Sequence, residues 1–249
     1  MPKINIMQEI LLYGVCFFIV AFLYASVGHG GASGYLALMA LVGFSPFVMK
    51  PTALLLNVLV SLIAFISFYR AKHFKSKLLW PLIAGSIPFA FIGAIMPLSD
   101  NAYKKLLGVV LLLSIIRLVW NNANQTLKPE PQWPILFIIG SSIGLVSGMI
   151  GMGGGILLSP ILLLMGWSTM KQTAAISAIF IFLNSIAGII GQFKTGFDLG
   201  PQILSIIAFV LIGGSAGAYY GAKILPSKGM KYVLALVLIM AAGKLIFVK

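Results

Sequence analysis

The chain has 249 residues, of which 60% are hydrophobic and 8% are charged, and its formal net charge is +13. A soluble domain carries about a quarter charged residues, so this composition excludes soluble, disordered and fibrous proteins. The single cysteine, Cys16, excludes a disulfide scaffold. The sequence therefore predicts an all-α integral membrane protein, a polytopic helical bundle with about 8–10 membrane segments of about 20 residues each. The excess of Lys and Arg indicates cytoplasmic loops and contact with anionic lipid headgroups, and it would also favour anionic solutes.

The first apolar stretch follows Lys3 and has the outline of a signal peptide. Residues 25–27, Ala-Ser-Val, run directly into glycines and offer no convincing cleavage site. We therefore expect this stretch to belong to the mature membrane fold, as the repeat described next also indicates.

The two halves of the sequence repeat each other. Residues 49–53 read MKPTA, and residues 170–174 read MKQTA, 121 positions later. Further matches keep the same order at offsets of 123 to 127: 28–31 with 151–154, 43–45 with 166–168, Lys104 with Lys231, and Arg117 with Lys244. We expect a first membrane half over residues 1–120, a polar linker over 121–133 and a second membrane half over 134–249.

Each half contains five apolar segments. In the first half they cover roughly 9–27, 32–43, 52–69, 78–97 and 103–120. In the second half they cover roughly 134–150, 156–165, 171–191, 200–222 and 230–247. The second segment of each half would rise only ~15–18 Å as a helix, which is about half of a bilayer core.

The relative direction of the halves depends on whether the short segment completes a crossing. If it does, each half crosses an odd number of times and the halves are inverted, whereas a segment that only dips into the membrane makes them parallel. Both arrangements leave equal numbers of Lys and Arg in the cytoplasm, so the positive-inside rule does not decide between them. We expect inverted repeats, because alternating access is commonly built from inverted repeats with broken helices.

A cluster of glycines precedes each short segment. Glycine costs about 1 kcal/mol per residue inside a helix, and the backbone that an irregular stretch exposes must face protein or an aqueous cavity. Each cluster also opens a helix, whose N-terminal amides and partial positive charge form an anion site. Close helix packing is the alternative explanation. We expect these glycines to bind the substrate: Gly28, Gly30, Gly31, Gly151, Gly153, Gly154 and Gly155.

Polar side chains near the clusters complete the expected site. His29 can couple protons to the substrate or only bond the irregular backbone, and its repeat counterpart is Met152, so its role is not symmetric. Ser33 follows the first cluster, and Thr52 and Thr173 occupy equivalent positions beside the short segments. Other intramembrane polar residues line a pathway or bond neighbouring helices: Asn57, Ser61, Ser177, Asn184, Ser185 and Gln192. Two runs with glycine at every fourth position, starting at 140 and at 213, are typical of close helix packing.

The sequence lacks the residues that an enzyme, a metal site or a nucleotide site would need. No P-loop or HExxH occurs, and Ser33 stands where a dinucleotide fingerprint needs its last glycine. The two histidines, one cysteine and four acids are too scattered for a metal site or a carboxylate pair. We expect no cofactor, no bound metal and no enzymatic activity.

The stretches GHGGASGYLALMALVGFSP and GMIGMGGGILLSPILLLMGW, each followed by MK(P/Q)TA, resemble the sulfite exporter TauE/SafE family of membrane permeases. The resemblance covers essentially the whole chain. Residues 151–155 and Pro160 match the G-x-G-G-G and proline pattern of the family, whereas the first repeat departs from it at His29, Ala32 and Ala37. The resemblance implies a carrier of the bacterial inner membrane for small sulfur-containing or related organic anions, such as sulfite, sulfonates or thiosulfate.

Together these observations predict a secondary transporter, or permease, that carries a small anion such as sulfite by alternating access. An anion channel remains an alternative, and a membrane scaffold or an enzyme without transport has less support. The expected partners are the anionic substrate and membrane lipids, with a proton or a sodium ion as a candidate coupling ion. No nucleic acid partner is expected, and the sequence implies no particular oligomeric state.

Overall fold

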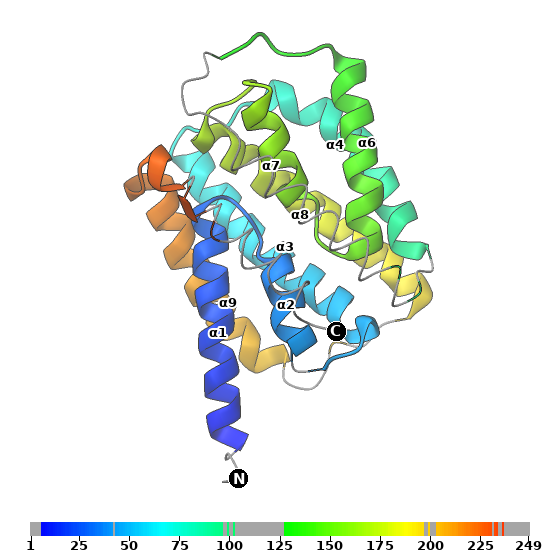
Figure 1. Cartoon of the computed structure of the whole chain (residues 1–249), viewed down its shortest axis with the longest axis vertical. Coiled ribbons are helices and arrows are strands. Elements are labelled where there is room, and N and C mark those ends of the chain that lie inside the picture. The colour runs from blue at the N-terminus through cyan, green and yellow to red at the C-terminus, as the bar shows by residue number, and fades with distance from the viewer. Residues whose placement is uncertain are drawn as a thin grey trace.

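The computed structural model describes residues 6–41, 43–96, 127–196 and 203–230, and the single positions 99, 102, 199, 232, 233 and 236. All regular structure in these residues is helical, which confirms the predicted all-α class (Figure 1). Before position 97 the helices are α1 (Ile6–Ser26), α2 (Ala32–Leu41), α3 (Pro46–Arg70) and α4 (Ser76–Ile95). After position 126 they are α6 (Trp133–Ile150), α7 (Gly155–Leu164), α8 (Met170–Thr195), α9 (Ile203–Tyr219) and the π-helical turn η1 (Tyr220–Ile224). The expected segments over 103–120 and most of 230–247 lie outside the described residues, as do Lys104, Arg117, Lys231 and Lys244.

The helix lengths are those of a membrane protein with two half-length helices. α2 and α7 have 10 residues each, which is about 15 Å of helix in a hydrocarbon core of about 30 Å. Within the described residues, five helices are long and apolar enough to cross a membrane: Phe47–Arg70, Ser76–Ile95, Trp133–Ile150, Met170–Lys194 and Ile203–Ile224. The short segments and the multi-pass class are therefore confirmed.

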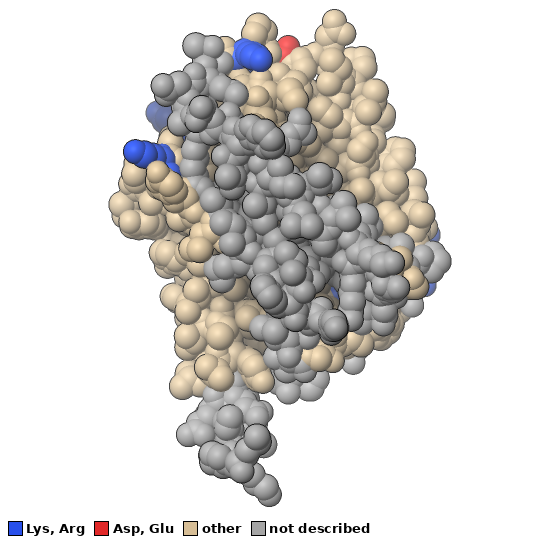
Figure 2. Space-filling model, in the orientation of Figure 1, with Lys and Arg blue, Asp and Glu red and all other residues tan. Residues whose placement is uncertain are grey.

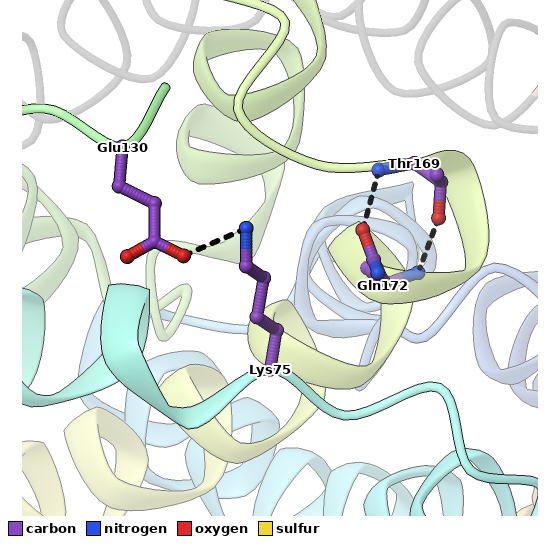
Figure 3. Close-up of polar contacts among 4 residues, drawn as sticks. All are labelled: Lys75, Glu130, Thr169 and Gln172. Atoms are coloured by element: carbon purple, nitrogen blue, oxygen red, sulfur yellow. Dashed lines mark hydrogen bonds and ion pairs between the residues drawn. The ribbon is translucent and has the colours of Figure 1, made fainter. Parts of the chain in front are cut away.

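The helix starts follow from local sequence. α8 begins with a capping box, in which the Gln172 amide donates to Thr169 Oγ1 over 3.3 Å and the Thr169 amide donates to Gln172 Oε1 over 2.9 Å (Figure 3). α3 begins at Pro46, six positions before the expected start of this segment. Proline is favourable there because an amide in the first turn needs no helical partner. The chain therefore becomes helical directly after Ser45.

The helices pair reciprocally across the molecule. α3 packs against α8, and this pair is flanked by α1 with α9 on one side and by α4 with α6 on the other (Figure 1). Among the described helices, α1, the first before position 97, thus packs against α9, and α6, the first after position 126, packs against α4. The short helices α2 and α7 lie against α3 and α8, respectively.

Glycines bring the flanking pairs into close contact. A Cβ atom on any of six glycines would overlap a backbone carbonyl oxygen of the facing helix. On α6 these are Gly140, Gly144 and Gly148 against Leu82, Ser86 and Ala90 of α4, and on α9 and η1 they are Gly213, Gly217 and Gly221 against Phe18, Phe22 and Ser26 of α1. The two runs with glycine at every fourth position therefore pack helices closely, as predicted.

The described charges lie toward the ends of the helices, and the sides of the bundle are apolar. Figure 2 shows the described Lys and Arg near the top and the edges of the face in view. Leu204, Ile138 and Ile212 are more than 60% exposed, as expected for side chains that face lipid. At one end, Lys75 Nζ lies 2.7 Å from Glu130 Oε1 and connects the α3–α4 loop to the segment before α6 (Figure 3).

Candidate functional site

The first glycine loop, residues 27–31, separates α1 from α2. Its backbone turns back at Gly28, with φ of +77°, and at Gly31, with φ of +96°, values that favour glycine because it has no Cβ. The His29 amide donates to the Tyr24 carbonyl over 2.9 Å, which closes the end of α1. The loop is buried throughout, so it places irregular backbone inside the protein, as the sequence predicts.

The second glycine loop, residues 151–154, separates α6 from α7 in the same way. Gly151 caps α6 in the left-handed conformation, with φ of +84°, and Gly153 has φ of +69°. Gly154 is the N-cap of α7, also left-handed, with φ of +80°. A left-handed residue before the first helical residue turns successive amides toward one place, an arrangement that binds anions in many proteins.

Each glycine loop packs against the start of a long helix from the other part of the chain. A Cβ on Gly28 would overlap the backbone of Ala174 in α8. A Cβ on Gly151 would lie 3.3 Å from the Cβ of Lys50 in α3. The two loops are therefore placed by α3 and α8, the pair at the middle of the bundle.

Asn57 of α3 joins the two loops. Its Oδ1 accepts a hydrogen bond from the Ala32 amide at the start of α2, over 2.9 Å, and its Nδ2 donates to the Met152 carbonyl of the second loop, over 3.1 Å. Nδ2 also lies 3.4 Å from Ser185 Oγ of α8. The sequence indicates Asn57 only as one of several intramembrane polar residues, because no spacing signal connects it with partners so far along the chain.

His29 joins the first loop to α7 and α8. Its side chain is 1% exposed, with Nδ1 3.1 Å from the Val27 carbonyl oxygen and Nε2 3.3 Å from Ser159 Oγ of α7. Ser159 Oγ lies 2.8 Å from Ser177 Oγ of α8. The imidazole therefore lies in a chain of hydroxyl groups between the loop and both helices.

The expected hydroxyl groups have partners of their own. Ser33 Oγ lies 2.6 Å from the Tyr24 hydroxyl. Thr52 Oγ1 donates to the Leu199 carbonyl over 3.2 Å, in the connection between α8 and α9, whereas Thr173 Oγ1 lies 2.7 Å from Ser168 Oγ before α8. The structure thus places Thr52 and Thr173 at equivalent helix starts, each bonded to a loop instead of to a glycine cluster.

The loops hold backbone donors inside the protein. Among the described residues, no atom accepts a hydrogen bond from the amides of Gly30, Gly31, Gly153 or Gly154. All four glycines are buried. Among the residues that the structure describes, no buried side chain is a Lys, Arg, Asp or Glu. In those residues, no group of three His, Cys, Asp or Glu could hold a metal ion. The polar character of the site therefore comes from amides, hydroxyls and one imidazole.

The fold and this site define a class of protein. Helices long enough to cross a membrane pack against two half-length helices that begin at buried glycine loops, and discontinuous helices of this kind are typical of membrane transporters. The model of the family described as sulfite exporter TauE/SafE matches residues 13–245. The chain belongs to this family, and it is a multi-pass membrane protein of a transporter family.

Curated relatives agree with this class. The chain is 34% identical over 244 residues to the probable membrane transporter protein y4hK of Sinorhizobium fredii. The matched region covers 96% of this chain and 99% of the relative. It is 24% identical over 226 residues to the probable membrane transporter protein YunE of Bacillus subtilis, with 82% of each chain covered. The probable membrane transporter protein YjnA of the same organism is 24% identical over 259 residues, with 96% of this chain and 99% of the relative covered. No solved structure matches the chain.

Proposed function

We propose that this protein is a secondary transporter of the bacterial inner membrane. It carries a small anion, a sulfur oxyanion or an organosulfonate such as sulfite, by alternating access, and it catalyses no reaction. The family and its relatives support transport of a small solute through a lipid environment. The class of substrate is argued from the site.

The observation that carries the proposal is the set of buried amides in the two glycine loops. Gly30, Gly31, Gly153 and Gly154 have no hydrogen-bond acceptor among the described residues, and each loop leads into a helix N-terminus with its partial positive charge. Hydrogen bonds to a charged group contribute about 1.5–3 kcal/mol each. Several of them would hold a desolvated anion without a fixed cation, and the binding would stay weak enough for release.

The proposed binding residues are drawn from both loops and from the helix starts beside them. His29 would respond to protons, and the hydroxyl groups would reach the substrate after exchanging their present partners. The proposed set is Gly28, His29, Gly30, Gly31, Ser33, Thr52, Gly151, Gly153, Gly154, Gly155 and Thr173.

We further propose that residues 1–120 and 134–249 are inverted repeats on either side of the linker over 121–133. Two features support a duplication: each part contains one 10-residue helix after a glycine loop, and the packing of α1 with α9 mirrors that of α6 with α4. Alternating access would follow from rocking of the two repeats around the loops.

Uptake into proteoliposomes tests the function. We expect saturable uptake of labelled sulfite under anaerobic conditions, competition by excess thiosulfate and sulfonates, and counterflow from vesicles preloaded with unlabelled sulfite. Conduction without saturation or counterflow would favour the channel alternative. If no sulfur anion is taken up or competes under either membrane polarity, the proposed substrate class is wrong.

A pair of glycine variants tests the site. Gly154→Val should abolish uptake, because a Cβ at this position would lie 2.8 Å from Ile143 Cγ2 and 2.9 Å from Phe180 Cε1. Gly43→Val is the matched control, since Gly43 also has a positive φ, of +84°, but its Cβ would have no atom within 4 Å. Gly154→Ala gives a milder test if the valine variant does not insert. Wild-type uptake by a correctly inserted Gly154→Val protein would overturn the assignment.

A further inference from the structure

We propose that Asn57 is a positioning residue that holds the two glycine loops together as one unit. The inference rests on the proposed function only for what the loops do, because the connection itself is a matter of geometry. Asn57 belongs to neither loop. It lies on α3 and is 1% exposed. One end of its amide bonds to Ala32, directly after the first loop, and the other end bonds to Met152 of the second loop.

The planar amide gives this contact its effect. Oδ1 accepts from the Ala32 amide, the first of α2, over 2.9 Å, while Nδ2 donates to the Met152 carbonyl over 3.1 Å. Oδ1 and Nδ2 are fixed on one carbon atom, so a shift of either loop must break its bond to Asn57 or move the amide that holds the other loop. A broken bond at a buried group costs more than one at the surface, because no water replaces the partner.

Two glycines make room for this side chain. A Cβ on Gly30 would overlap Asn57 Oδ1, and a Cβ on Gly153 would lie 3.0 Å from Asn57 Nδ2. The absence of a side chain at these positions thus lets both loops reach the same amide. Ser185 Oγ, 3.4 Å from Nδ2, extends the contact to α8, so one residue of α3 connects both loops and the opposite central helix.

Asn184 provides a matched comparison. It is also a buried amide on a central helix, with 1% of its surface exposed. Its Nδ2 donates to the Phe180 carbonyl of its own helix, over 2.8 Å, so this hydrogen bond connects no separate elements. Replacing Asn184 removes a buried amide from the same bundle and keeps both contacts of Asn57.

Hydrogen–deuterium exchange of the purified full-length protein in lipid nanodiscs tests the connection without any substrate. In Asn57→Leu we expect amide exchange at least tenfold faster than in the wild type over both 28–33 and 151–155. In Asn184→Leu we expect both stretches to keep wild-type exchange. Unchanged exchange over 151–155 in Asn57→Leu, or equal acceleration in the two variants, would overturn the proposal.

Asn57→Asp separates the two ends of the amide. Exchange is compared at a pH above the pKa of the buried carboxyl, because only the ionised Asp side chain keeps an acceptor for the Ala32 amide and has no donor for the Met152 carbonyl. We expect 28–33 to stay protected while 151–155 exchanges faster, and Asn184→Asp controls for a buried charge. Wild-type protection of 151–155 in Asn57→Asp would mean that Asn57 only caps α2. This variant also carries the test if Asn57→Leu does not give a monodisperse protein.

Transport kinetics connect the inference to the proposed function. In proteoliposomes, Asn57→Leu should raise the KM for sulfite at least tenfold, and Asn184→Leu should stay within about twofold of the wild type. A KM within twofold of the wild type in Asn57→Leu would overturn the positioning role. If the wild type itself transports no sulfur anion, the proposed function fails, and the exchange measurement still decides whether Asn57 holds the loops together.

Discussion

His29 Nε2 and Ser159 Oγ lie 3.3 Å apart, which bonds the first glycine loop directly to α7. The two residues are 130 positions apart in sequence. Ser159 continues the contact to Ser177 of α8. This link is separate from the one that Asn57 makes, so the first loop is held to the later helices at two points.

A double-mutant cycle tests the contact between His29 and Ser159. His29→Leu and Ser159→Ala should each lower the free energy of unfolding by roughly 1–3 kcal/mol, because each leaves a buried polar partner without its hydrogen bond. The double variant should lose less than the sum, as expected for residues in contact. Detergent-induced unfolding followed by circular dichroism measures this. Ser142→Ala is the control second site, since its hydroxyl donates to the Ile138 carbonyl of its own helix and bonds to no other helix among the described residues. Its effect should add to that of His29→Leu, whereas additivity of the first pair would contradict the contact.

The close packing of α4 and α6 predicts opposite outcomes for two glycine-to-alanine changes. Gly144→Ala should destabilise the protein by about 1–3 kcal/mol, because its Cβ would meet the Ser86 backbone of α4. Gly188→Ala on α8 meets only the end of the Leu54 side chain, at 3.1 Å, and should be neutral or stabilising by up to about 1 kcal/mol. Thermal unfolding of both variants in one detergent compares their stabilities. Equal midpoints would show that the close contact between α4 and α6 at Gly144 does not contribute to stability.

The capping box of α8 predicts a difference between two helix starts. Thr169→Ala removes the bond to the Gln172 amide and should cost about 0.5–2 kcal/mol of stability. Ser45→Ala is the matched variant, because Ser45 is the N-cap of α3 and makes no side-chain cap hydrogen bond. Its unfolding midpoint should equal that of the wild type. A larger loss for Ser45→Ala than for Thr169→Ala would contradict this assignment.

His73, in the loop between α3 and α4, predicts a pH dependence of stability. Burial lowers the pKa of His73 from its ordinary value of 6.5, and the nearby Lys171 lowers it further, against the opposing effect of the Ala222 carbonyl. The unfolded chain then binds this proton more readily than the folded one, so protonation of His73 favours unfolding. The free energy of unfolding therefore decreases as the pH falls below about 6.5. Between about pH 7.5 and pH 5.5, we expect the unfolding midpoint of the wild type to fall more than that of His73→Asn. A parallel fall in both proteins would contradict the shift.

Apolar runs and glycine clusters were enough to predict the described long helices and both short segments from the sequence. They could not predict which helices pair, because an apolar stretch carries no mark of its partner. Asn57 illustrates the same limit within the site, since its contacts with Met152 and Ser185 span 95 and 128 positions. Thr52 and Thr173 are equivalent in the repeat, yet their hydroxyls have different partners, because the loops around them differ.

The packing of α1 against α9 has a consequence for how the protein is made. When α1 enters the bilayer during synthesis, its partner helix lies more than 170 positions further along the chain and has not been translated. Lipid, or the insertion machinery, must therefore cover the face of α1 that α9 later occupies. The glycine contacts between these helices can form only after α9 has been translated, so a chain truncated before α9 leaves α1 without its partner.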